Sequence, residues 1–226
     1  MKAKVLTALL PAAVLFAATA HAGAPPPREQ QQQQQPCEGR AALDEPLRQE
    51  LLRMYEADQA ARARWNADKA DETAGRAMIA LDEKHTERLR AIFKEHGFPG
   101  FCLAGRDGAQ AAHVMLLHGP SHELRKEALP LVEAAVKKGE LPAQAAATLT
   151  DKVLVGEGKP QLYGTHFDFV DGKLVMSPVS DPEGLEERRA RVGLQPLKEY
   201  MEGLEKMYRV KADPGAAPPA PPKKKP

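Results

Sequence analysis

The sequence has little cysteine, few aromatic residues and no excess of charge of either sign. It holds 2 Cys in 226 residues, and only 5% of its residues are Phe, Trp or Tyr. The 32 basic residues almost balance the 31 acidic ones. That balance excludes the strongly basic surface with which a nucleic-acid-binding protein neutralises many phosphates, so we expect no nucleic-acid partner.

Long hydrophobic runs are confined to the N-terminus. Residues 1–22 have the layout of a secretory signal, with Lys2 and Lys4, an apolar run from Val5 to Ala20, and a small-x-small cleavage site that ends at Ala22. No cysteine follows that site directly, and no later stretch approaches the roughly 20 apolar residues of a membrane-spanning helix. The sequence predicts a periplasmic or secreted protein, cleaved after Ala22, without a transmembrane segment.

Short motifs for nucleophilic catalysis, phosphate binding and metal binding are missing. There is no G-x-S-x-G sequence, and the glycines of 156–159 precede a predicted strand instead of opening a helix. His113 and His118 are five residues apart, about 140° around a helix, so a regular helix cannot point both at one ion. His118 and His122 have helical spacing, but Gly119 and Pro120 interrupt it. We expect no local metal site, a site assembled from distant residues stays open, and the sequence does not identify a cofactor.

The two cysteines leave two alternatives open. In an oxidising compartment Cys37 and Cys102 can form a disulfide that closes a loop of about 65 residues and contributes about 4 kcal/mol. The other alternative is two unpaired thiols, because Cys37 lies at the edge of a polar tail.

Composition divides the mature chain into a central domain and two tails. Residues 23–38 are rich in Pro and Gln, and residues 211–226 are rich in Pro and end in lysines, so we expect both to be disordered. The lysines could touch anionic envelope polymers, or the tail could simply be solvated. Residues 39–210 have the size of a single domain.

Helical periodicity covers most of that domain. The most apolar window, Arg106 to His118, should be a buried central helix that Asp107 caps. We expect other helices from near Asp44 to Trp65, from Asp71 to His96, from Ser121 to Gly139 with a kink or restart at Pro130, from Pro142 to about Val155, from Asp181 to before Gly193, and from Pro196 onward. The predicted fold class is mainly α, a single helical domain with one late β-hairpin.

The hairpin is predicted from a change of period. Apolar and polar residues alternate from Leu162 to Phe169, and Asp171-Gly172 is typical of a two-residue type I′ turn. With that turn, Phe169 should face Leu174.

Several charged and imidazole side chains fall on apolar helix stripes. Asp58 and Arg62 are an i,i+4 pair in register with Leu51. His85 lies in the buried row of the second helix, with Asp82 as its neighbour three residues earlier. An aspartate beside an imidazole can hold a general base, and it can equally satisfy a core histidine.

The order of several motifs resembles a bacterial domain family of unknown function, DUF6624. They are D-Q-x-x-R (58–62), H-G-F-P (96–99), D-G-A-Q-A-A-H-x-x-L-L-H (107–118), G-K-P-Q-x-Y-G-T (158–165) and D-P-E-G-x-x-E-R-R-x-x-V-G-L (181–194). In the family pattern, Asn, Trp and Gln are usual where this chain has His85, His113 and His166. The residues that match, and that the resemblance favours as site residues, are Asp58, Arg62, His118, Tyr163, Thr165, Asp181, Arg188 and Arg189.

Three interpretations of these polar residues stay open. The first is a binding or interaction module with a polar pocket for a small anionic or polar ligand, lined by Arg62, by Arg188 or Arg189 and by the other candidates His85, His113, Tyr163, Thr165 and Asp181. The second is a hydrolase or lyase in which His118 acts as general base, with Asp58 or Asp82 as its partner. The third is that these residues only join helices together. The sequence alone selects no reaction, ligand or oligomeric state.

Overall fold

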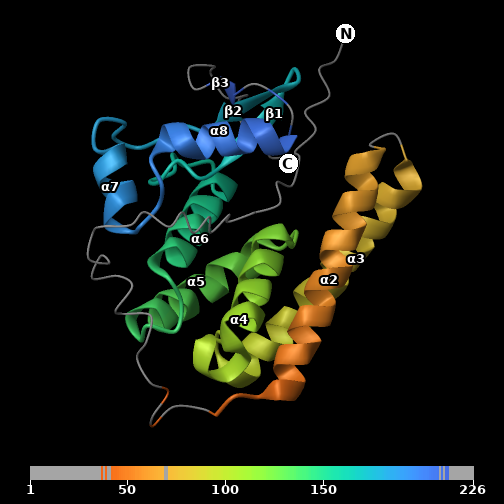
Figure 1. Cartoon of the computed structure of the whole chain (residues 1–226). Coiled ribbons are helices and arrows are strands. Elements are labelled where there is room, and N and C mark those ends of the chain that lie inside the picture. The colour runs from red at the N-terminus through yellow and green to blue at the C-terminus, as the bar shows by residue number, and fades with distance from the viewer. Residues whose placement is uncertain are drawn as a thin grey trace, which may run out of the picture. The chain divides into compact units, whose positions relative to one another are not determined.

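The computed structural model describes residues 37, 39, 42–68, 71–208, 210 and 212–213. These residues form two compact units, one that ends at Pro142 and one that begins at Ala143, and each is described by itself (Figure 1). The prediction of a mainly α-helical fold with one late β-hairpin is confirmed. The predicted signal peptide, the segment 23–36 and the tail after residue 213 lie outside the described residues. No helix in the described part is long and apolar enough to cross a membrane.

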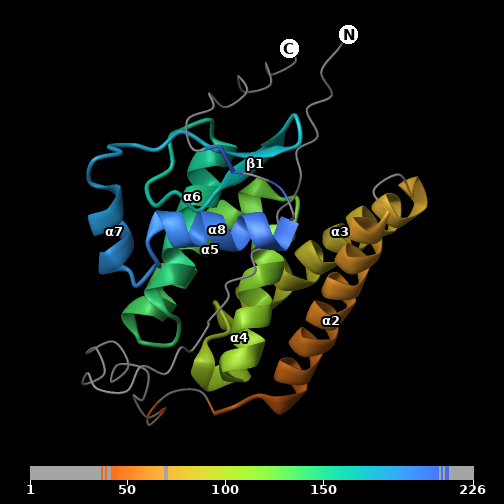
Figure 2. The same cartoon turned by 45° about the horizontal axis from the view of Figure 1, so that its top comes forward.

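The N-terminal unit begins with two long helices that lie side by side. Helix α2 spans Glu45–Ala67 and helix α3 spans Glu72–His96, and the views agree that they run antiparallel (Figures 1 and 2). Both begin as the sequence predicts: Asp44 accepts from the Leu47 amide, and Asp71 accepts from the amides of the second and third residues that follow it. Gly97 ends α3 with a φ of 70°, as expected of a glycine C-cap.

Helix α4, Phe101–His118, is the buried element of this unit and packs against α2 and α3. Every side chain from Ala111 to His118 is buried, which confirms the predicted central helix. The backbone turns sharply at Gly105, where φ is 68°, so one extra turn precedes the predicted start at Arg106. Asp107 follows this turn, and its carboxylate accepts from the Gly108 amide and from Arg48 of α2.

The two cysteines of the chain both lie in this unit. Cys37 and Cys102 form a disulfide, and Cys102 lies in the first turn of α4. The cross-link therefore joins the chain that precedes α2 to the start of the buried helix.

Helix α5, His122–Lys137, completes the N-terminal unit. Ser121 caps it by accepting from the Leu124 amide, as predicted. The helix runs through Pro130 without a restart.

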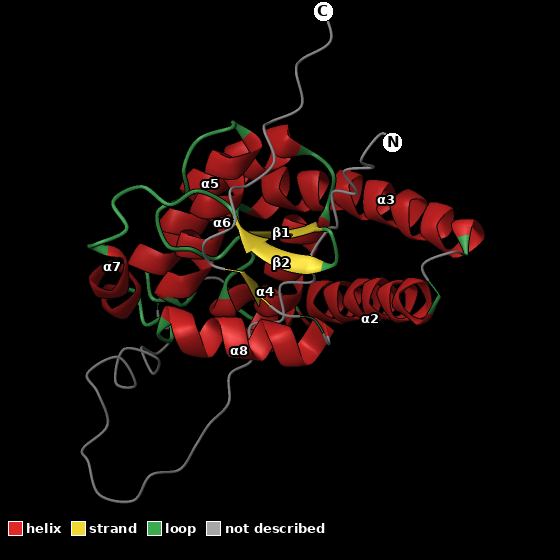
Figure 3. Cartoon of the chain, turned by 90° about the horizontal axis from the view of Figure 1, so that it is seen from above, coloured by secondary structure: helices red, strands yellow, loops and turns green. Residues whose placement is uncertain are grey.

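The C-terminal unit joins three helices to a small sheet. Helix α6 spans Ala143–Gly156, α7 spans Leu185–Arg191 and α8 spans Leu197–Tyr208. In Figure 3, α8 lies beside strands β1, Phe167–Val170, and β2, Lys173–Met176. Phe167, Leu174 and Leu204 form the buried cluster between the sheet and α8.

The hairpin has the predicted register but is shorter than predicted. Phe169 pairs with Leu174 and Phe167 with Met176, and both Asp171 and Gly172 have positive φ, as a type I′ turn requires. The prediction of a strand from Leu162 is wrong, because residues before Phe167 form a loop whose backbone groups are bound by buried side chains.

Two further predictions in this unit are wrong at their boundaries. Ala212–Asp213, predicted as part of the C-terminal tail, forms strand β3 and pairs in parallel with β2. Helix α7 begins at Leu185 instead of near Asp181, because Asp181 adopts a φ of 49° and its carboxylate accepts from the Gly184 amide in a turn before the helix.

Candidate functional site

Helix α2 places Asp58 and Arg62 on its buried face. The two residues continue the stripe of Leu51, at steps of seven and eleven residues, so the helical repeat itself carries their side chains inward. Asp58 is 1% exposed and Arg62 is 4% exposed. Gln59, the next residue, donates to Asp58 Oδ2 at 2.8 Å.

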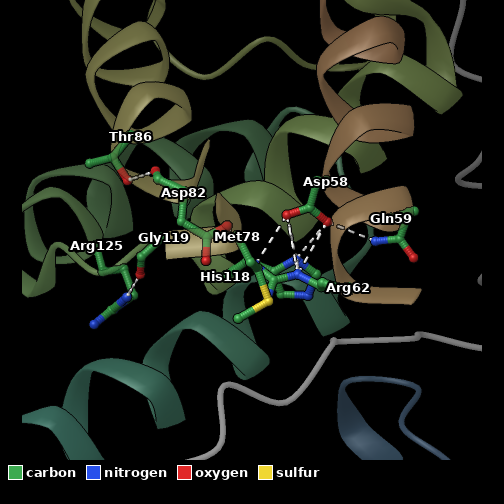
Figure 4. A network of polar contacts seen from close by, with 9 residues as sticks. All are labelled: Asp58, Gln59, Arg62, Met78, Asp82, Thr86, His118, Gly119 and Arg125. Atoms are coloured by element: carbon green, nitrogen blue, oxygen red, sulfur yellow. Dashed lines mark hydrogen bonds and ion pairs between the residues drawn. The ribbon is translucent and has the colours of Figure 1, made fainter. Parts of the chain in front are cut away.

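The last residue of α4, His118, meets this pair. Its Nδ1 lies 2.9 Å from Asp58 Oδ2 and 2.8 Å from Arg62 Nε, and its side chain is fully buried (Figure 4). Arg62 Nε is always a donor, whereas a carboxylate is the stronger acceptor for an imidazole proton. His118 Nδ1 cannot accept from Arg62 Nε and donate to Asp58 at the same time. In one tautomer it accepts from Arg62 Nε at 2.8 Å, and in the other it donates to Asp58 while Arg62 Nε donates to the same carboxylate at 3.2 and 3.3 Å.

Helix α3 supplies the fourth charged group, Asp82. Arg62 Nη2 donates to Asp82 Oδ1 at 2.7 Å and lies 3.1 Å from Asp58 Oδ1. Asp82 is 3% exposed. We call the four side chains of Asp58, Arg62, Asp82 and His118 the Arg62 cluster. Three helices contribute to it, and its members are separated by up to 60 residues in sequence.

A close helix approach makes this meeting possible. A Cβ atom at Gly119, directly after His118, would lie 2.6 Å from Thr86 Oγ1 of α3, so only glycine lets the end of α4 come this near. Thr86 donates to the backbone carbonyl of Asp82, and Arg125 of α5 donates to the carbonyl of Gly119 (Figure 4).

The two aspartates of the cluster have pKa values shifted in opposite directions. Burial raises the pKa of Asp58, but the hydrogen bond from His118 and the charges of His118 and Arg62 outweigh it and bring the pKa to about 2. Burial also raises the pKa of Asp82, and there the single contact with Arg62 compensates less, so the pKa reaches about 6. A pair of carboxyl groups with separated pKa values is typical of functional sites, although ion-pair networks also produce it.

Asp82 and Arg62 keep unused hydrogen-bonding capacity. Asp82 Oδ2 is buried and has no hydrogen-bond partner within the described residues. Arg62 Nη1 carries two hydrogens, and its partner in the same part of the chain is Met78 Sδ at 3.6 Å, a weak acceptor.

The other two histidine candidates of this unit are buried beside the cluster. Asp82 does not hydrogen-bond His85 as their spacing suggests, since its carboxylate turns to Arg62, and His85 Nδ1 has no hydrogen-bond partner among the residues described. Burial lowers the pKa of His85. His113 packs its ring edge-on against Phe98, and burial, aided by the charge of His118, lowers its pKa to about 4. Both rings are therefore neutral at pH 7.

The C-terminal unit contains a second buried carboxylate, Asp151 of α6. It accepts from the amides of Leu162, Tyr163 and Thr165 and from the Thr165 hydroxyl, at 2.7 to 3.0 Å. Burial raises its pKa, and these four hydrogen bonds oppose that shift. The loop before β1 is thus folded around one charge.

The arginine candidates of α7 hold the same loop by its carbonyls. Arg188 donates to the Leu162 carbonyl at 2.9 Å and to Asp181 Oδ2 at 2.7 Å, and Arg189 donates to the carbonyls of Tyr163 and Gln195. Most of these donors are engaged within the unit, whereas Arg189 Nη2 is buried without a hydrogen-bond partner among the described residues. A ligand role for Tyr163, Thr165, Asp181, Arg188 and Arg189 stays a prediction.

A family model fits most of the ordered chain. The model of DUF6624, a family of unknown function, matches residues 45–213, which include both units from the start of α2 to β3. The chain belongs to DUF6624. Comparisons with curated proteins and with solved structures gave no match for this DUF6624 chain.

The signal that identified Asp58 in the sequence was also present at Asp151, but sequence reasoning did not use it there. Asp151 falls between Leu149 and Val153 on the buried side of α6, just as Asp58 continues the stripe of Leu51. An acidic residue in an apolar row was therefore a usable signal in both helices. Within the described residues of this DUF6624 chain, no three His, Cys, Asp or Glu side chains are placed to hold a metal ion.

The predicted pocket shared by Arg62 and Arg188 or Arg189 stays a prediction. Arg62 and His118 belong to the N-terminal unit, whereas Arg188 and Arg189 belong to the C-terminal unit. Each set of residues has a defined environment inside its own unit.

Proposed function

We propose that the N-terminal unit of this DUF6624 chain is a binding module for a small polar ligand, with the Arg62 cluster as its site. The observation that carries the proposal is the mutual contact of four buried ionisable side chains from three helices. Withdrawing such groups from water costs several kcal/mol per ion, and well-packed apolar residues join helices at least as well. A purely structural role does not account for this desolvation cost, whereas a ligand-binding role does.

The unequal satisfaction of the two carboxylates also supports a site. Asp58 receives hydrogen bonds from Gln59, His118 and Arg62, but Asp82 uses one of its two oxygens within the described residues. Buried polar atoms in proteins are usually paired, so an unpaired carboxylate oxygen calls for an explanation. A ligand that donates a hydrogen bond to Asp82 Oδ2 is one such explanation.

An enzyme is the second candidate, and it rests on one specific contact. The bond between His118 Nδ1 and Asp58 is the orientation that leaves Nε2 as the basic atom of a histidine general base. A hydrolase or lyase would need substrate to reach Nε2, and His118 is fully buried. The groups that a bound ligand would use, Asp82 and Arg62, are also buried, so burial does not separate the two candidates. We prefer the binding module because Asp82 Oδ2 has no hydrogen-bond partner within the described residues.

Native mass spectrometry of the full chain, purified without denaturation, tests the binding proposal. We expect a retained mass on the native chain that is reduced or lost in Asp82→Asn. Glu83→Gln is the matched control, because it removes one charge from the exposed side of the same helix turn and should retain the mass. A retained mass that is unchanged in Asp82→Asn would argue against the Arg62 cluster as the site.

The enzyme alternative is separated by a different variant. His118→Gln keeps a hydrogen-bonding side chain but removes the base, so it should abolish turnover in a screen of ester, amide and elimination substrates. If the native chain turns over none of them while retaining a ligand, the binding module stands without the enzyme.

We further propose that the protein is exported to the periplasm or secreted. The N-terminal signal layout and a disulfide between Cys37 and Cys102 support this, because disulfides persist mainly in oxidising compartments. The intact mass of the protein from a periplasmic extract should correspond to a chain that begins at Gly23. A full-length chain recovered only from the cytoplasmic fraction would contradict export.

A further inference from the structure

The hydrogen bonds that the Arg62 cluster leaves unused define what kind of group it accepts. We infer that the cluster binds an uncharged group that donates one hydrogen bond and accepts another, such as a carboxamide or a hydroxyl, in preference to an anion or a cation. This inference rests on the binding function proposed above and narrows its ligand class.

The acceptor side of the site is Asp82 Oδ2. The other oxygen of the same carboxylate, Oδ1, accepts from Arg62 Nη2 at 2.7 Å. Asp82 is 3% exposed, and Oδ2 is buried without a hydrogen-bond partner in the described chain. A ligand atom at this position must donate a hydrogen.

The donor side is Arg62 Nη1. The other donors of the guanidinium are engaged, since Nε and Nη2 face Asp58 and Asp82. Nη1 meets the thioether of Met78 at 3.6 Å, which leaves it able to donate to a better acceptor. Nη1 and Nη2 share one carbon, so the open donor lies next to the arginine atom that holds Asp82.

Charge then excludes the ionic ligands. An anion at Nη1 would approach the carboxylates of Asp58 and Asp82, which already surround the single guanidinium. A cation at Asp82 Oδ2 would approach Arg62 without giving Nη1 an acceptor. An uncharged group with one acceptor atom and one N–H or O–H satisfies both positions and introduces no uncompensated charge, and burying an unpaired charge is the more costly outcome.

The raised pKa of Asp82 is consistent with a preference for an uncharged ligand. Burial raises its pKa to about 6, so the site tolerates either form of this carboxyl group, and an uncharged ligand can donate to the ionised form. Arg62 contacts its carboxylate directly, the charge of Asp58 acts on it from α2, and His85 follows one turn later on its own helix.

Three nearly isosteric probes test the inference directly. Acetamide offers one acceptor and one donor edge, acetate offers only acceptors and carries a negative charge, and acetamidinium offers only donors and carries a positive charge. At a ceiling of about 1.5 kcal/mol per heavy atom, a probe of four heavy atoms can reach a Kd of about 40 μM at best, so titration up to millimolar concentrations covers weaker binding as well. Each probe is titrated into the full chain at constant ionic strength. The readout is the Arg62 Nε–H signal in proton–nitrogen correlation spectra, identified by its loss in Arg62→Lys.

We expect acetamide to bind about tenfold more tightly than acetate or acetamidinium, because each ionic probe leaves one buried polar atom unpaired. Asp82→Asn should reverse the preference. Its amide oxygen takes the place of Oδ1 at Arg62 Nη2, and its NH2 group then occupies the place of Oδ2, so the site presents two donors and should favour acetate. Glu83→Gln, which changes the same charge on the exposed side of α3, should keep the native order.

The possible failures are distinguishable. If none of the three probes moves the Arg62 signal, the cluster is closed to ligands and the proposed function fails together with the inference. If probes bind but acetate equals or exceeds acetamide on the native chain, the binding module stands and the preference for an uncharged group is wrong. An order that is the same in Asp82→Asn as in the native chain also overturns the assignment of Asp82 Oδ2 as the acceptor.

Discussion

The two units bury the same kinds of charged group and use them differently. In the N-terminal unit Asp58, Arg62, Asp82 and His118 bind one another, side chain to side chain. In the C-terminal unit Asp151 binds mainly backbone amides of the loop before β1, and Arg188 and Arg189 bind largely backbone carbonyls.

This difference separates architecture from a candidate site. A backbone group has a fixed place in the chain, so a charge bound to it determines local structure and has little freedom to exchange partners. Each unit has a buried charged side chain with one atom unpartnered in the described residues, Asp82 Oδ2 in the N-terminal unit and Arg189 Nη2 in the C-terminal unit. Asp82 differs in that its neighbours are side chains, which can change partners when a ligand binds. A buried charge bound to the backbone fixes local structure, whereas buried charges bound to one another form a candidate site. Burial of a charge alone therefore does not indicate a function.

The largest effect should come from removing the charge that holds the loop. Asp151→Ala leaves three partly buried amides and one hydroxyl without their acceptor, each at about 1–3 kcal/mol and not additively, so we expect the free energy of unfolding to fall by about 5 kcal/mol. Urea denaturation measures it, with Glu183→Ala as an exposed control of the same unit that should change stability by less than about 0.5 kcal/mol. A loss below about 1 kcal/mol would show that Asp151 is not architectural.

The next effect should be confined to the N-terminal unit. Both cysteines belong to that unit, and opening a loop of about 65 residues should cost about 4 kcal/mol. Hydrogen exchange followed by peptide mass spectrometry, with and without reductant, should show faster exchange in α2 and α4 and little change in α8. Equal acceleration in α8 would mean that the two units unfold together. A Cys37→Ser, Cys102→Ser double variant, with and without reductant, controls for the reductant itself.

A smaller effect should appear in the pH dependence of stability. Folded Asp82 keeps its proton up to about pH 6, whereas the ordinary aspartate pKa is 3.8, so the folded state binds more protons between these values. Its contribution to stability is therefore complete below about pH 4 and is lost as pH rises through 6, by about 1–3 kcal/mol.

Urea unfolding midpoints of the native chain and of Asp82→Asn, measured from pH 4.5 to 7.5, test this decrease of stability with rising pH. In Asp82→Asn the contribution of Asp82 must vanish. Asp58 acts in the opposite sense, since its lowered pKa gives stability that is lost only as pH falls from 3.8 toward 2. A native slope that persists unchanged in Asp82→Asn assigns the titration to another group.

The smallest effect concerns helix ends. In the N-terminal unit α2, α3 and α5 each have a side-chain N-cap, whereas α7 in the C-terminal unit begins at Gly184 with no side-chain cap hydrogen bond. Asp71→Ala should lower the free energy of unfolding by about 1 kcal/mol. Asp71→Ser, which keeps an acceptor at the same position, should recover most of this loss in the same thermal scan, and no difference between the two would show that the cap is dispensable.

Local chemistry made the elements predictable. Capping residues such as Asp44, Asp71 and Ser121, the stop at Gly97 and the Asp171-Gly172 turn act within four residues of themselves, so the sequence was sufficient to locate the helices and the hairpin register. The strand predicted from Leu162 failed because Asp151, more than ten residues earlier, binds the backbone that a strand would have used.

What the sequence by itself determined is therefore which helix faces turn inward, since helical periodicity places Asp58, Arg62, His85 and His118 on buried faces, with Asp82 as the neighbour of His85. Only the tertiary structure decided which of them meet. Asp82 pairs with Arg62 and not with its helical neighbour His85, and Asp58 becomes the partner of His118, because the approach of α3 and α4 at Gly119 brings atoms together that no spacing along one helix relates.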